Sequence, residues 1–321
     1  MTLEATAQAL EAALPGRVRT NEPLAPLTTY RLGGPAAILV SPGSTGDVET
    51  MASVLLNAPP LGELPLLVLG RGSNTVVSDA GWPGVAVHAG PGLSWIRGET
   101  GAPLSVGAGA GTSLPQLANW AARRELTGLE FLVSIPGSVG GGVRMNAGAH
   151  GSEIADCLAD ATLLDLDGPS LDVIPLAELG MEYRRSAVGD RRVVIEARFS
   201  LEPGVAAAIR ERMESFRRHR AATQPGAALN AGSVFKNPSG DWAGRLVEAA
   251  GLKGFSVGGA SVSKKHANFF VAGPGATAQD VFDLVHAVRD RVHTEFGIEL
   301  EPEVRFAGAF REPAEAGETP S

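Results

Sequence analysis

The sequence predicts an α+β protein, and two observations carry this prediction. Up to about residue 200, short β-rich runs alternate with glycine-rich turns and helical stretches: PLLVLG at 65–70, GVAVHAG at 84–90, LPQLANWAARREL at 114–126 and RRVVIEARFSL at 191–201. After Pro203 the pattern changes, because VAAAIRERMESFRRHRAA carries apolar residues at helical spacing with basic residues between them. We therefore expect a second domain to open near residue 203.

The ends of the chain and the last long helix have signals of their own. Residues 1–20 begin with an amphipathic helix whose early acidic residues are unlike the basic start of a secretory signal. The segment ATAQDVFDLVHAVRDRVHTEFG predicts a late helix with Thr277 as its N-cap and Gly297 as its C-terminal stop. The tail at 311–321 is predicted to be disordered.

Composition excludes several classes of function. The formal charge of −8 and pI near 5.3 give no long-range attraction to nucleic acid or to an anionic membrane, so any bound phosphate must be held by local groups. Cys157 is the only cysteine, which rules out an intrachain disulfide, and no metal-ligand spacing occurs. The longest apolar runs are strand-sized, far short of the roughly 20 residues of a bilayer span. We expect a cytoplasmic protein without membrane insertion, nucleic-acid binding or a metal site.

Glycine-rich loops are the first candidate ligand site. Gly70-Arg71-Gly72-Ser73-Asn74 follows a buried strand, so its backbone N–H groups and the Ser73 hydroxyl could meet a phosphate. A second cluster, PGSVGGG at 136–142 followed by NAGA at 146–149, has room for a flat ligand or a pyrophosphate. The alternative is that these glycines serve only tight turns and bulges. A third cluster, GAGAG at 107–111, lacks the spacing and the acidic partner of a dinucleotide fingerprint, so we reject a Rossmann interpretation of it.

Seven motifs, read together, resemble one enzyme family. They are TTYRLGGPA at 28–36, VLGRGSNTVVSD at 68–79, IPGSVGGGVRMNAGAHG at 135–151, YRRS at 183–186, NAGSVFKNP at 230–238, KKHANFFV at 264–271 and FGIELEPEVRF at 296–306. In order and spacing they are similar to the UDP-N-acetylenolpyruvoylglucosamine reductases, over roughly residues 20 to 308. With only Tyr30 and Tyr183 present, both inside other motifs, the chain resembles the short form of the family, which lacks a tyrosine-bearing loop over the substrate.

The resemblance implies an FAD-binding domain of the vanillyl-alcohol-oxidase type at 21–202, with two lobes split near residue 90. A smaller α/β substrate-binding domain would follow at 203–310. FAD would be bound non-covalently and reduced by NADPH. The implied cofactor-binding residues are Thr29, Arg31, Gly33, Gly70, Arg71, Gly72, Ser73, Asn74, Thr75, Pro136, Gly137, Ser138, Gly140, Gly141, Asn146, Ala147 and Gly148.

The implied reaction reduces UDP-N-acetylglucosamine enolpyruvate to UDP-N-acetylmuramate, a step in peptidoglycan precursor synthesis. By resemblance, Arg184 and Glu303 hold and polarise the substrate carboxylate, and Ser233 donates the proton to the α-carbon. A carboxylate beside the substrate carboxylate is unfavourable, so Glu303 is either neutralised by Arg184 or protonated. Each residue also has a structural alternative, since a Gly-Ser turn commonly binds its own backbone and a loop arginine is commonly a surface partner.

The remaining implied contacts are to the UDP-sugar, from Tyr183, Arg220, Lys236, Asn237 and His266. His266 could equally be a core histidine, and Arg220 part of a solvated helix face. The chain departs from the family pattern at His150, where tyrosine is common, at Ala231, where many members have cysteine, and at Val188, where phenylalanine is usual. These departures bear on packing around flavin and substrate.

Two other functions compete with this one. The first is an FAD-dependent sugar or alcohol oxidase on the same scaffold, and the second is a flavin- or nucleotide-sugar-binding protein without activity. Retention of Ser233, Arg184 and Glu303 argues against the binding protein without activity, and an oxidase would be distinguished by oxygen consumption with an alcohol substrate. A monomer is favoured.

Overall fold

The polypeptide packs as two units, each assembled from separate stretches of sequence. The fold is given by a computed structural model that describes residues 2–57, 64–99, 104–168, 170–226 and 228–312. The first unit contains the residues up to Glu22, Ala36–Gly72 and Pro83–Ala222. The second unit contains Pro23–Pro35, Ser73–Trp82 and the residues from Thr223 on.

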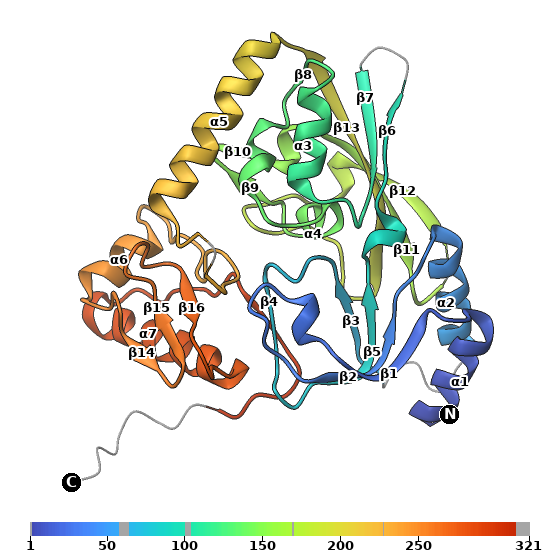
Figure 1. Ribbon diagram of the computed structural model, residues 1–321, viewed down its shortest axis with the longest axis horizontal. Coiled ribbons are helices and arrows are strands. Elements are labelled where there is room, and N and C mark those ends of the chain that lie inside the picture. The colour runs from blue at the N-terminus through green and yellow to red at the C-terminus, as the bar shows by residue number, and fades with distance from the viewer. Residues whose placement is uncertain (1, 58–63, 100–103, 169, 227, 313–321) are drawn as a thin grey trace. The chain divides into compact units, whose positions relative to one another are not determined.

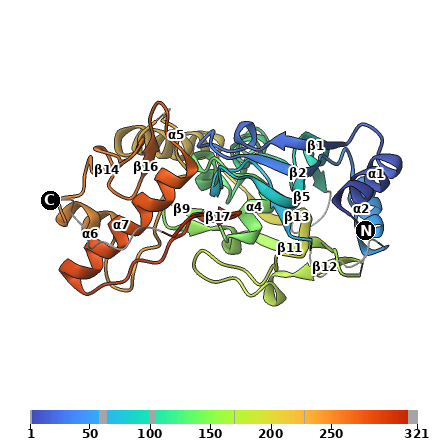
Figure 2. The same cartoon turned by 90° about the horizontal axis from the view of Figure 1, so that it is seen from below.

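The first unit begins with a four-stranded sheet in the order β1-β2-β5-β3, whose β3 and β5 are parallel. The elements are α1 (Leu3–Ala13), β1 (Val18–Pro23), β2 (Pro35–Val40), α2 (Thr45–Asn57), β3 (Leu66–Leu69) and β5 (Trp82–His88). The helices α1 and α2 lie side by side (Figures 1 and 2) and bury Leu10, Met51 and Leu55 fully. These residues share one apolar core with the inward side chains of β2 and β5. The predicted N-terminal helix and the strands expected at 65–70 and 84–90 are confirmed.

A larger antiparallel sheet in the same unit has the order β12-β11-β13-β7-β6, and β8 pairs with the end of β13. Its strands are β6 (Ile96–Glu99), β7 (Leu104–Gly109), β8 (Leu126–Thr127), β11 (Leu158–Asp165), β12 (Leu171–Pro175) and β13 (Arg192–Pro203). A two-stranded hairpin of β9 (Gly148–Ala149) and β10 (Ser152–Glu153) stands apart from it. The change from the first sheet to the second falls between His88 and Ile96.

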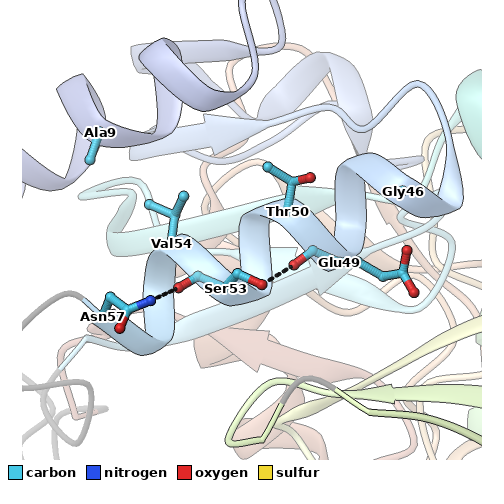
Figure 3. Close-up of a pocket in the computed structure, with 7 residues that line it drawn as sticks. All are labelled: Ala9, Gly46, Glu49, Thr50, Ser53, Val54 and Asn57. Carbon is cyan, nitrogen blue, oxygen red and sulfur yellow. Dashed lines mark hydrogen bonds between the residues drawn. The ribbon is translucent and has the colours of Figure 1, made fainter.

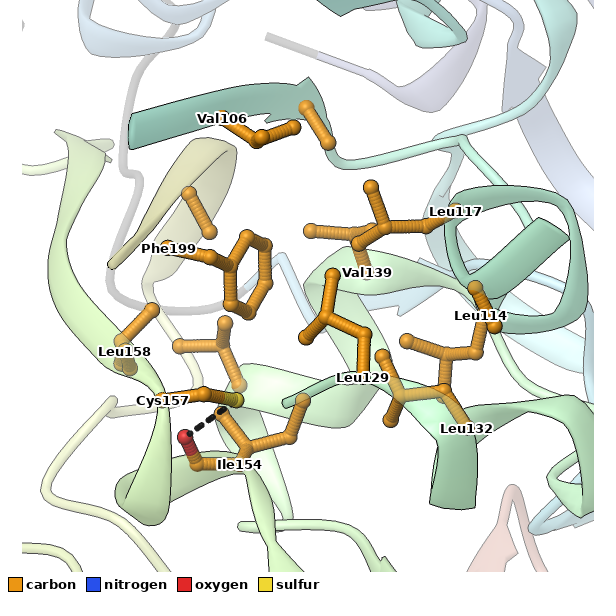
Figure 4. Packing of buried hydrophobic residues seen from close by; sticks show 14 of the residues in the cluster. Val106, Leu114, Leu117, Leu129, Leu132, Val139, Ile154, Cys157, Leu158 and Phe199 are labelled. Carbon is orange, nitrogen blue, oxygen red and sulfur yellow. Dashed lines mark hydrogen bonds between the residues drawn. The ribbon is translucent and has the colours of Figure 1, made fainter. Parts of the chain in front are cut away.

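The core of this larger sheet is closed by α3 (Leu114–Ala122), the 3-10 helix η3 (Glu130–Ser134) and α4 (Val139–Arg144). Leu114, Leu117, Ala118 and Ala121 of α3 are buried, which is the i, i+3, i+4, i+7 stripe of a helix that covers a sheet. In Figure 4 the Phe199 ring lies among Val106, Val139 and Leu158, on the inner face of the sheet.

The helix predicted over 114–126 is shorter than expected. It ends at Ala122, because Glu125 adopts a left-handed backbone with φ of 58° and the chain then turns into β8. Helical periodicity extends through Leu126 in the sequence, but a left-handed residue cannot continue a right-handed helix.

The helix α5 (Ala206–Thr223) packs with the first unit (Figure 1). Its buried Ile209 and Met213 join the core of the larger sheet, and Arg212 forms an ion pair of 3.0 Å with Glu130 of η3, which is 5% exposed. The sequence assigned this helix to a second domain starting at 203. By packing it belongs to the first unit, because its apolar stripe fits a surface formed by residues about 80 positions earlier.

The second unit combines α6 (Ala243–Ala249) and α7 (Ala278–Phe296) with two small sheets. One has the order β14-β15-β16, and the other pairs β17 with β4 in parallel. Their strands are β4 (Thr75–Val77), β14 (Ser256–Val257), β15 (Ala260–Val262), β16 (Phe270–Ala272) and β17 (Arg305–Ala307). Tyr30 is fully buried in this unit, where its hydroxyl donates to the Phe270 carbonyl at 3.0 Å and burial raises its pKa.

The N-terminus of α7 is capped as the sequence predicted. The Thr277 hydroxyl accepts from the Asp280 amide, and the Asp280 carboxylate accepts from the Thr277 amide, which makes a capping box. The helix ends at Gly297, which is left-handed with φ of 68°. Of the predicted tail, residues 313–321 lie outside the described residues.

We expect Thr277→Ala to destabilise the fold by about 1 kcal/mol, because the Asp280 amide in the first turn of α7 loses the Thr277 hydroxyl as its acceptor. The matched control is Thr294→Ala, whose exposed hydroxyl donates only to the Asp290 carbonyl within the same helix. Urea denaturation followed by circular dichroism checks this. Equal midpoints for the two variants would contradict the capping role.

Candidate active site

Ser233 lies in an extended segment that is held from both sides within the second unit. On one side it forms a β-bridge with Phe269, and the Val234 amide donates to the Asn268 carbonyl at 2.9 Å. On the other side the Val234 carbonyl accepts from the Glu303 amide at 2.7 Å. The structure therefore brings the backbones of Ser233 and Glu303 into neighbouring, hydrogen-bonded segments.

Asn74 joins the first glycine-rich loop to the segment that carries Glu303. Its side-chain amide donates to the Glu303 carbonyl at 2.9 Å, and its own carbonyl accepts from the Arg305 amide at 2.9 Å. Thr75 then pairs with Arg305 in the parallel ladder of β4 and β17. Motifs about 230 residues apart in the sequence are thus in direct contact in this unit.

Asn268 is a site residue that sequence reasoning missed. It is 4% exposed, and its side chain accepts from the Phe235 amide at 2.9 Å and donates to the Phe235 carbonyl at 2.8 Å. This pair of bonds substitutes for a strand partner and fixes the segment just after Ser233. The signal in the sequence was an asparagine between apolar residues in KKHANFFV, since a buried amide needs partners for both its ends.

The predicted UDP-sugar residues of the second unit lie along the same segment. Lys236 forms an ion pair of 2.6 Å with Glu301, and its amide donates to the Glu301 carbonyl. The Asn237 side chain accepts from the Ala243 amide at the start of α6. His266 accepts from the Asn268 amide through Nδ1, and burial followed by the Lys253 charge lowers its pKa, which favours a neutral ring.

The first predicted segment is anchored in the second unit as well. The Thr29 hydroxyl donates to the Asn230 carbonyl at 2.7 Å, at the first residue of the Ser233 motif. Arg31 is exposed and left-handed, and its guanidinium donates to the Pro26 carbonyl. Gly33 has φ of 121°, and a Cβ there would come within 2.8 Å of the Val77 Cβ, so only glycine fits.

In the first unit, the two glycine-rich loops predicted as a ligand site meet. A Cβ added to Gly70 would lie 2.2 Å from the Ser138 hydroxyl. Ser138 is 2% exposed and precedes α4 without making a capping bond through its side chain. Gly72 is left-handed, as a tight turn after β3 requires. A hydroxyl donor thus stands where both loops approach each other.

Much of the space beside the second loop is filled by protein. A Cβ on Gly140 would meet Ala110 at 3.0 Å, and one on Gly142 would meet Leu114 at 3.3 Å. The Gly140 amide donates to the Ala110 carbonyl, so it is committed within the fold. Gly141, by contrast, is exposed, and a Cβ there would meet only the Ser138 hydroxyl, at 3.6 Å. The loop therefore has open space at Gly141, next to Ser138, rather than at every glycine.

Asn146 is fully buried, and its side chain hydrogen-bonds to the backbone of two other segments. Its side chain donates to the Glu182 carbonyl at 3.0 Å and accepts from the Ala155 amide at 3.0 Å. The Ala147 carbonyl accepts from the Ile154 amide. These bonds join the second loop to the turn at 182–185, which carries Arg184.

Arg184 is the second central residue of that turn and is left-handed with φ of 56°. Paired backbone bonds between Glu182 and Arg185 close the turn. The Arg184 guanidinium donates to the Gly148 carbonyl at 2.8 Å, and it lies 5.0 Å from the centre of the half-exposed Tyr183 ring. Its orientation is therefore set by the second glycine-rich loop.

Arg220, predicted to contact the substrate, lies near the end of α5. Its guanidinium donates to the Ser134 carbonyl, and burial lowers its pKa. Arg220 thus holds α5 against η3, and a diphosphate contact stays a prediction.

Other features carry no site. The third glycine cluster is structural, because a Cβ on Gly109 or Gly111 would fall 2.2 Å or 2.0 Å from backbone carbonyls of the 90–93 segment. A shallow hollow beside α1 and α2 (Figure 3) is lined by Ser53 and Asn57, which bond to carbonyls of their own helix. Burial raises the pKa of the Cys157 thiol to about 12, which makes it unreactive.

Within the described parts of the chain, no three His, Cys, Asp or Glu side chains gather as a metal site would require. None of the described helices is long and apolar enough to cross a membrane.

Residues 36–173 match the family of FAD binding domains. The α+β fold, in which two glycine-rich loops meet at a buried serine before a short helix, is therefore that of a flavin-binding protein. Residues 224–307 match the C-terminal domain of UDP-N-acetylenolpyruvoylglucosamine reductase. The chain is 45% identical to the UDP-N-acetylenolpyruvoylglucosamine reductase 2 of Symbiobacterium thermophilum, with 92% of this chain and 93% of that one covered. It is 40% identical to the Bacillus subtilis reductase, with 96% and 100% covered.

A solved structure of the same family is also similar to this chain. The UDP-N-acetylenolpyruvylglucosamine reductase from Thermus caldophilus superposes with a TM-score of 0.74 at 36% identity, covering 91% of this chain and 98% of that one. The chain belongs to the UDP-N-acetylenolpyruvoylglucosamine reductase family, and the predicted fold class and family are confirmed.

Proposed function

We propose that this protein reduces UDP-N-acetylglucosamine enolpyruvate to UDP-N-acetylmuramate with NADPH, through non-covalently bound FAD, in peptidoglycan precursor synthesis. The observation that carries the proposal is a hydrogen-bonded junction in the second unit, in which Val234, next to Ser233, accepts from the Glu303 amide and Asn74 donates to the Glu303 carbonyl. It joins a candidate proton donor and a carboxylate to the loop that follows β3. Family membership supplies the substrate and the two cofactors.

The residues present fit a flavin dinucleotide. Gly70–Thr75 offers glycine backbone, the Ser73 hydroxyl and the Arg71 cation, and Ser138 with Gly141 offers a buried hydroxyl beside open space. Donors of this kind suit a pyrophosphate. Held by these residues, FAD would supply the hydride chemistry that links NADPH to the substrate double bond.

Arg184 is assigned to the substrate carboxylate. Its guanidinium can form paired bonds to a carboxylate, and the bond to the Gly148 carbonyl restricts how the group can turn. As negative charge develops on the carbon next to the carboxylate, a fixed cation stabilises it more than a mobile one would, because no reorganisation is needed. Glu303 is assigned to the same end of the substrate.

Ser233 is assigned as the proton donor. It is partly exposed, and Gly232 before it is left-handed, where an added Cβ would meet no described atom within 4 Å, so the Ser233 loop borders open space. A serine hydroxyl is a weak acid, but an enolate-like carbon is a strong enough base to take its proton in a site that excludes water. Lys236 and Asn237, which continue the Ser233 segment, and His266, which accepts from the Asn268 amide, are assigned to the UDP-sugar. Tyr183 and Arg220 in the first unit are assigned to it as well. We place the reaction in the cytoplasm.

We expect the purified protein to be yellow and to release intact FAD on denaturation. Neither glycine-rich loop, at 70–74 or at 136–149, carries a cysteine or histidine to which flavin could be attached covalently. His150, which follows the second loop, is hydrogen-bonded to Ser134. Flavin that stays with the denatured chain, or FMN, would contradict this.

The function itself is tested by following NADPH oxidation as the loss of the reduced nicotinamide's absorbance at about 340 nm. Oxidation should depend on the enolpyruvyl nucleotide sugar. Oxygen consumption with a sugar or alcohol in its place would identify the competing oxidase.

A further inference from the structure

The hairpin of β9 and β10 has a tight two-residue turn at its tip. Ala149 pairs with Ser152, and between them His150 and Gly151 have φ of 57° and 82°. Positive φ at both central residues is the signature of a type I′ turn, in which asparagine followed by glycine is favoured and histidine is tolerated. The turn alone therefore does not explain why a histidine stands at this position.

The His150 ring is held by two other elements of the first unit. It stacks on Phe216 of α5 with ring centres 4.0 Å apart and planes 7° from parallel. Its Nε2 lies 3.0 Å from the Ser134 hydroxyl of η3. That hydroxyl donates to the Phe131 carbonyl, so its lone pair accepts from the histidine, which places the imidazole proton on Nε2.

The same hairpin bears the acceptor for Arg184 at its base. Gly148, two residues before His150, accepts from the Arg184 guanidinium at 2.8 Å. A Cβ on Gly148 would lie 2.9 Å from that guanidinium and 2.7 Å from the Ser152 carbonyl, so the Arg184 guanidinium packs directly against the hairpin backbone. A shift of the hairpin would move the carbonyl that orients Arg184.

We propose that His150 is a positioning residue: by stacking on Phe216 and bonding to Ser134 it fixes the β9–β10 hairpin, and through the Gly148 carbonyl it fixes the Arg184 guanidinium for the substrate carboxylate. The inference rests on the proposed function, because it assigns the oriented group to that carboxylate. His150 touches neither substrate nor cofactor in this role.

Electrostatics supports a neutral ring. α5 presents His219 and Arg220 to it, and η3 presents the Ser134 hydroxyl. Burial, followed by the His219 and Arg220 charges, lowers the pKa of His150. Because the pKa is depressed, the anchored state is complete at neutral pH and is lost as the pH falls through that lowered pKa, where a charged ring would stand beside Arg220.

The experiment separates the ring from the turn with two substitutions. His150→Asn keeps the residue best suited to the left-handed turn and removes the ring, whereas His150→Phe keeps a stacking ring that cannot titrate. We expect His150→Asn to slow the reaction of the reduced enzyme with substrate by on the order of 10- to 100-fold, because a misplaced group costs that much. FAD content and reduction by NADPH should be unchanged. His150→Phe keeps the stacking contact with Phe216 but loses the bond to the Ser134 hydroxyl, so it should slow this step less than His150→Asn does and should lose the fall in rate at acidic pH.

A double-mutant cycle with Arg184→Lys tests whether the effect of His150 on the reaction is transmitted through Arg184. If His150 acts through Arg184, then His150→Asn should have little further effect once Arg184 is lysine, both on that rate and on the substrate Kd measured from the oxidised flavin spectrum. Independent, multiplying effects would overturn the proposal, as would full activity of His150→Asn. A wild-type protein that does not reduce the enolpyruvyl substrate would instead overturn the proposed function.

Discussion

Ser233→Ala is expected to slow the reaction of the reduced enzyme with the enolpyruvyl substrate by on the order of 10²–10⁴-fold, the usual cost of losing a positioned general acid. FAD binding and reduction by NADPH should remain nearly intact, because neither step uses this hydroxyl. The fold should also tolerate the change, since the segment is held by backbone pairing and by the Asn268 side chain rather than by the Ser233 hydroxyl. Stopped-flow absorbance of the flavin resolves the two half-reactions.

Two further variants sharpen this result. Ser233→Cys should recover part of the rate, since a thiol is also a proton donor at nearly the same place. Ser239→Ala, an exposed serine six positions later, is the matched control and should behave as wild type. If Ser233→Ala instead slowed reduction by NADPH and left the substrate step normal, the assignment of Ser233 as proton donor would be wrong.

Arg184→Lys is expected to lower kcat/KM for the substrate by on the order of 10²–10³-fold, comparable to the loss of one fixed donor at a developing charge. The charge is kept, so a purely electrostatic surface role predicts little change. A lysine ammonium, however, lacks the planar fork that can bond the Gly148 carbonyl and present further N–H groups in a fixed direction.

The neighbouring residue provides the control for this variant. Arg185 is 72% exposed and lies 3.8 Å from Glu182, so Arg185→Lys alters the same turn and the same kind of side chain. It should be close to neutral, as exposed ion pairs contribute little. Equal losses in both variants would show that the turn, and not the Arg184 guanidinium, is what the reaction needs. Steady-state kinetics with saturating NADPH distinguishes the two.

Local signals predicted several elements correctly because their causes lie within a few residues. The Thr277 cap bonds Asp280 three positions later, and Gly297 ends the helix through its own backbone freedom. The strands before Gly70 and after Arg191 follow from β-rich apolar runs. The extent of α3 was predicted too long, because its end depends on a left-handed residue, Glu125, which periodicity does not reveal.

The candidate site was predicted as a set of motifs, and the structure shows that several residues in them have packing or hydrogen-bonding roles within the fold. Gly140 and Gly142 were interpreted as room for a ligand, but Ala110 and Leu114 fill most of that space. Asn146 was interpreted as a cofactor contact, yet its side chain is buried in bonds to Glu182 and Ala155. Whether each predicted residue contacts a ligand stays a prediction.

The sequence by itself determined the α+β class, the positions of most helices and strands, and the family. It also determined the candidate site residues, such as the candidate proton donor Ser233. Each of these depends on residues close together in the chain or on the order of motifs. Only the tertiary structure decided that α5 packs with the first unit, that Asn268 clamps the Ser233 segment, and that His150 reaches Phe216 and Ser134. The partners in those contacts are separated by 16 to 82 residues, and their pairing depends on shape and buried hydrogen bonds that exist only once the chain has folded.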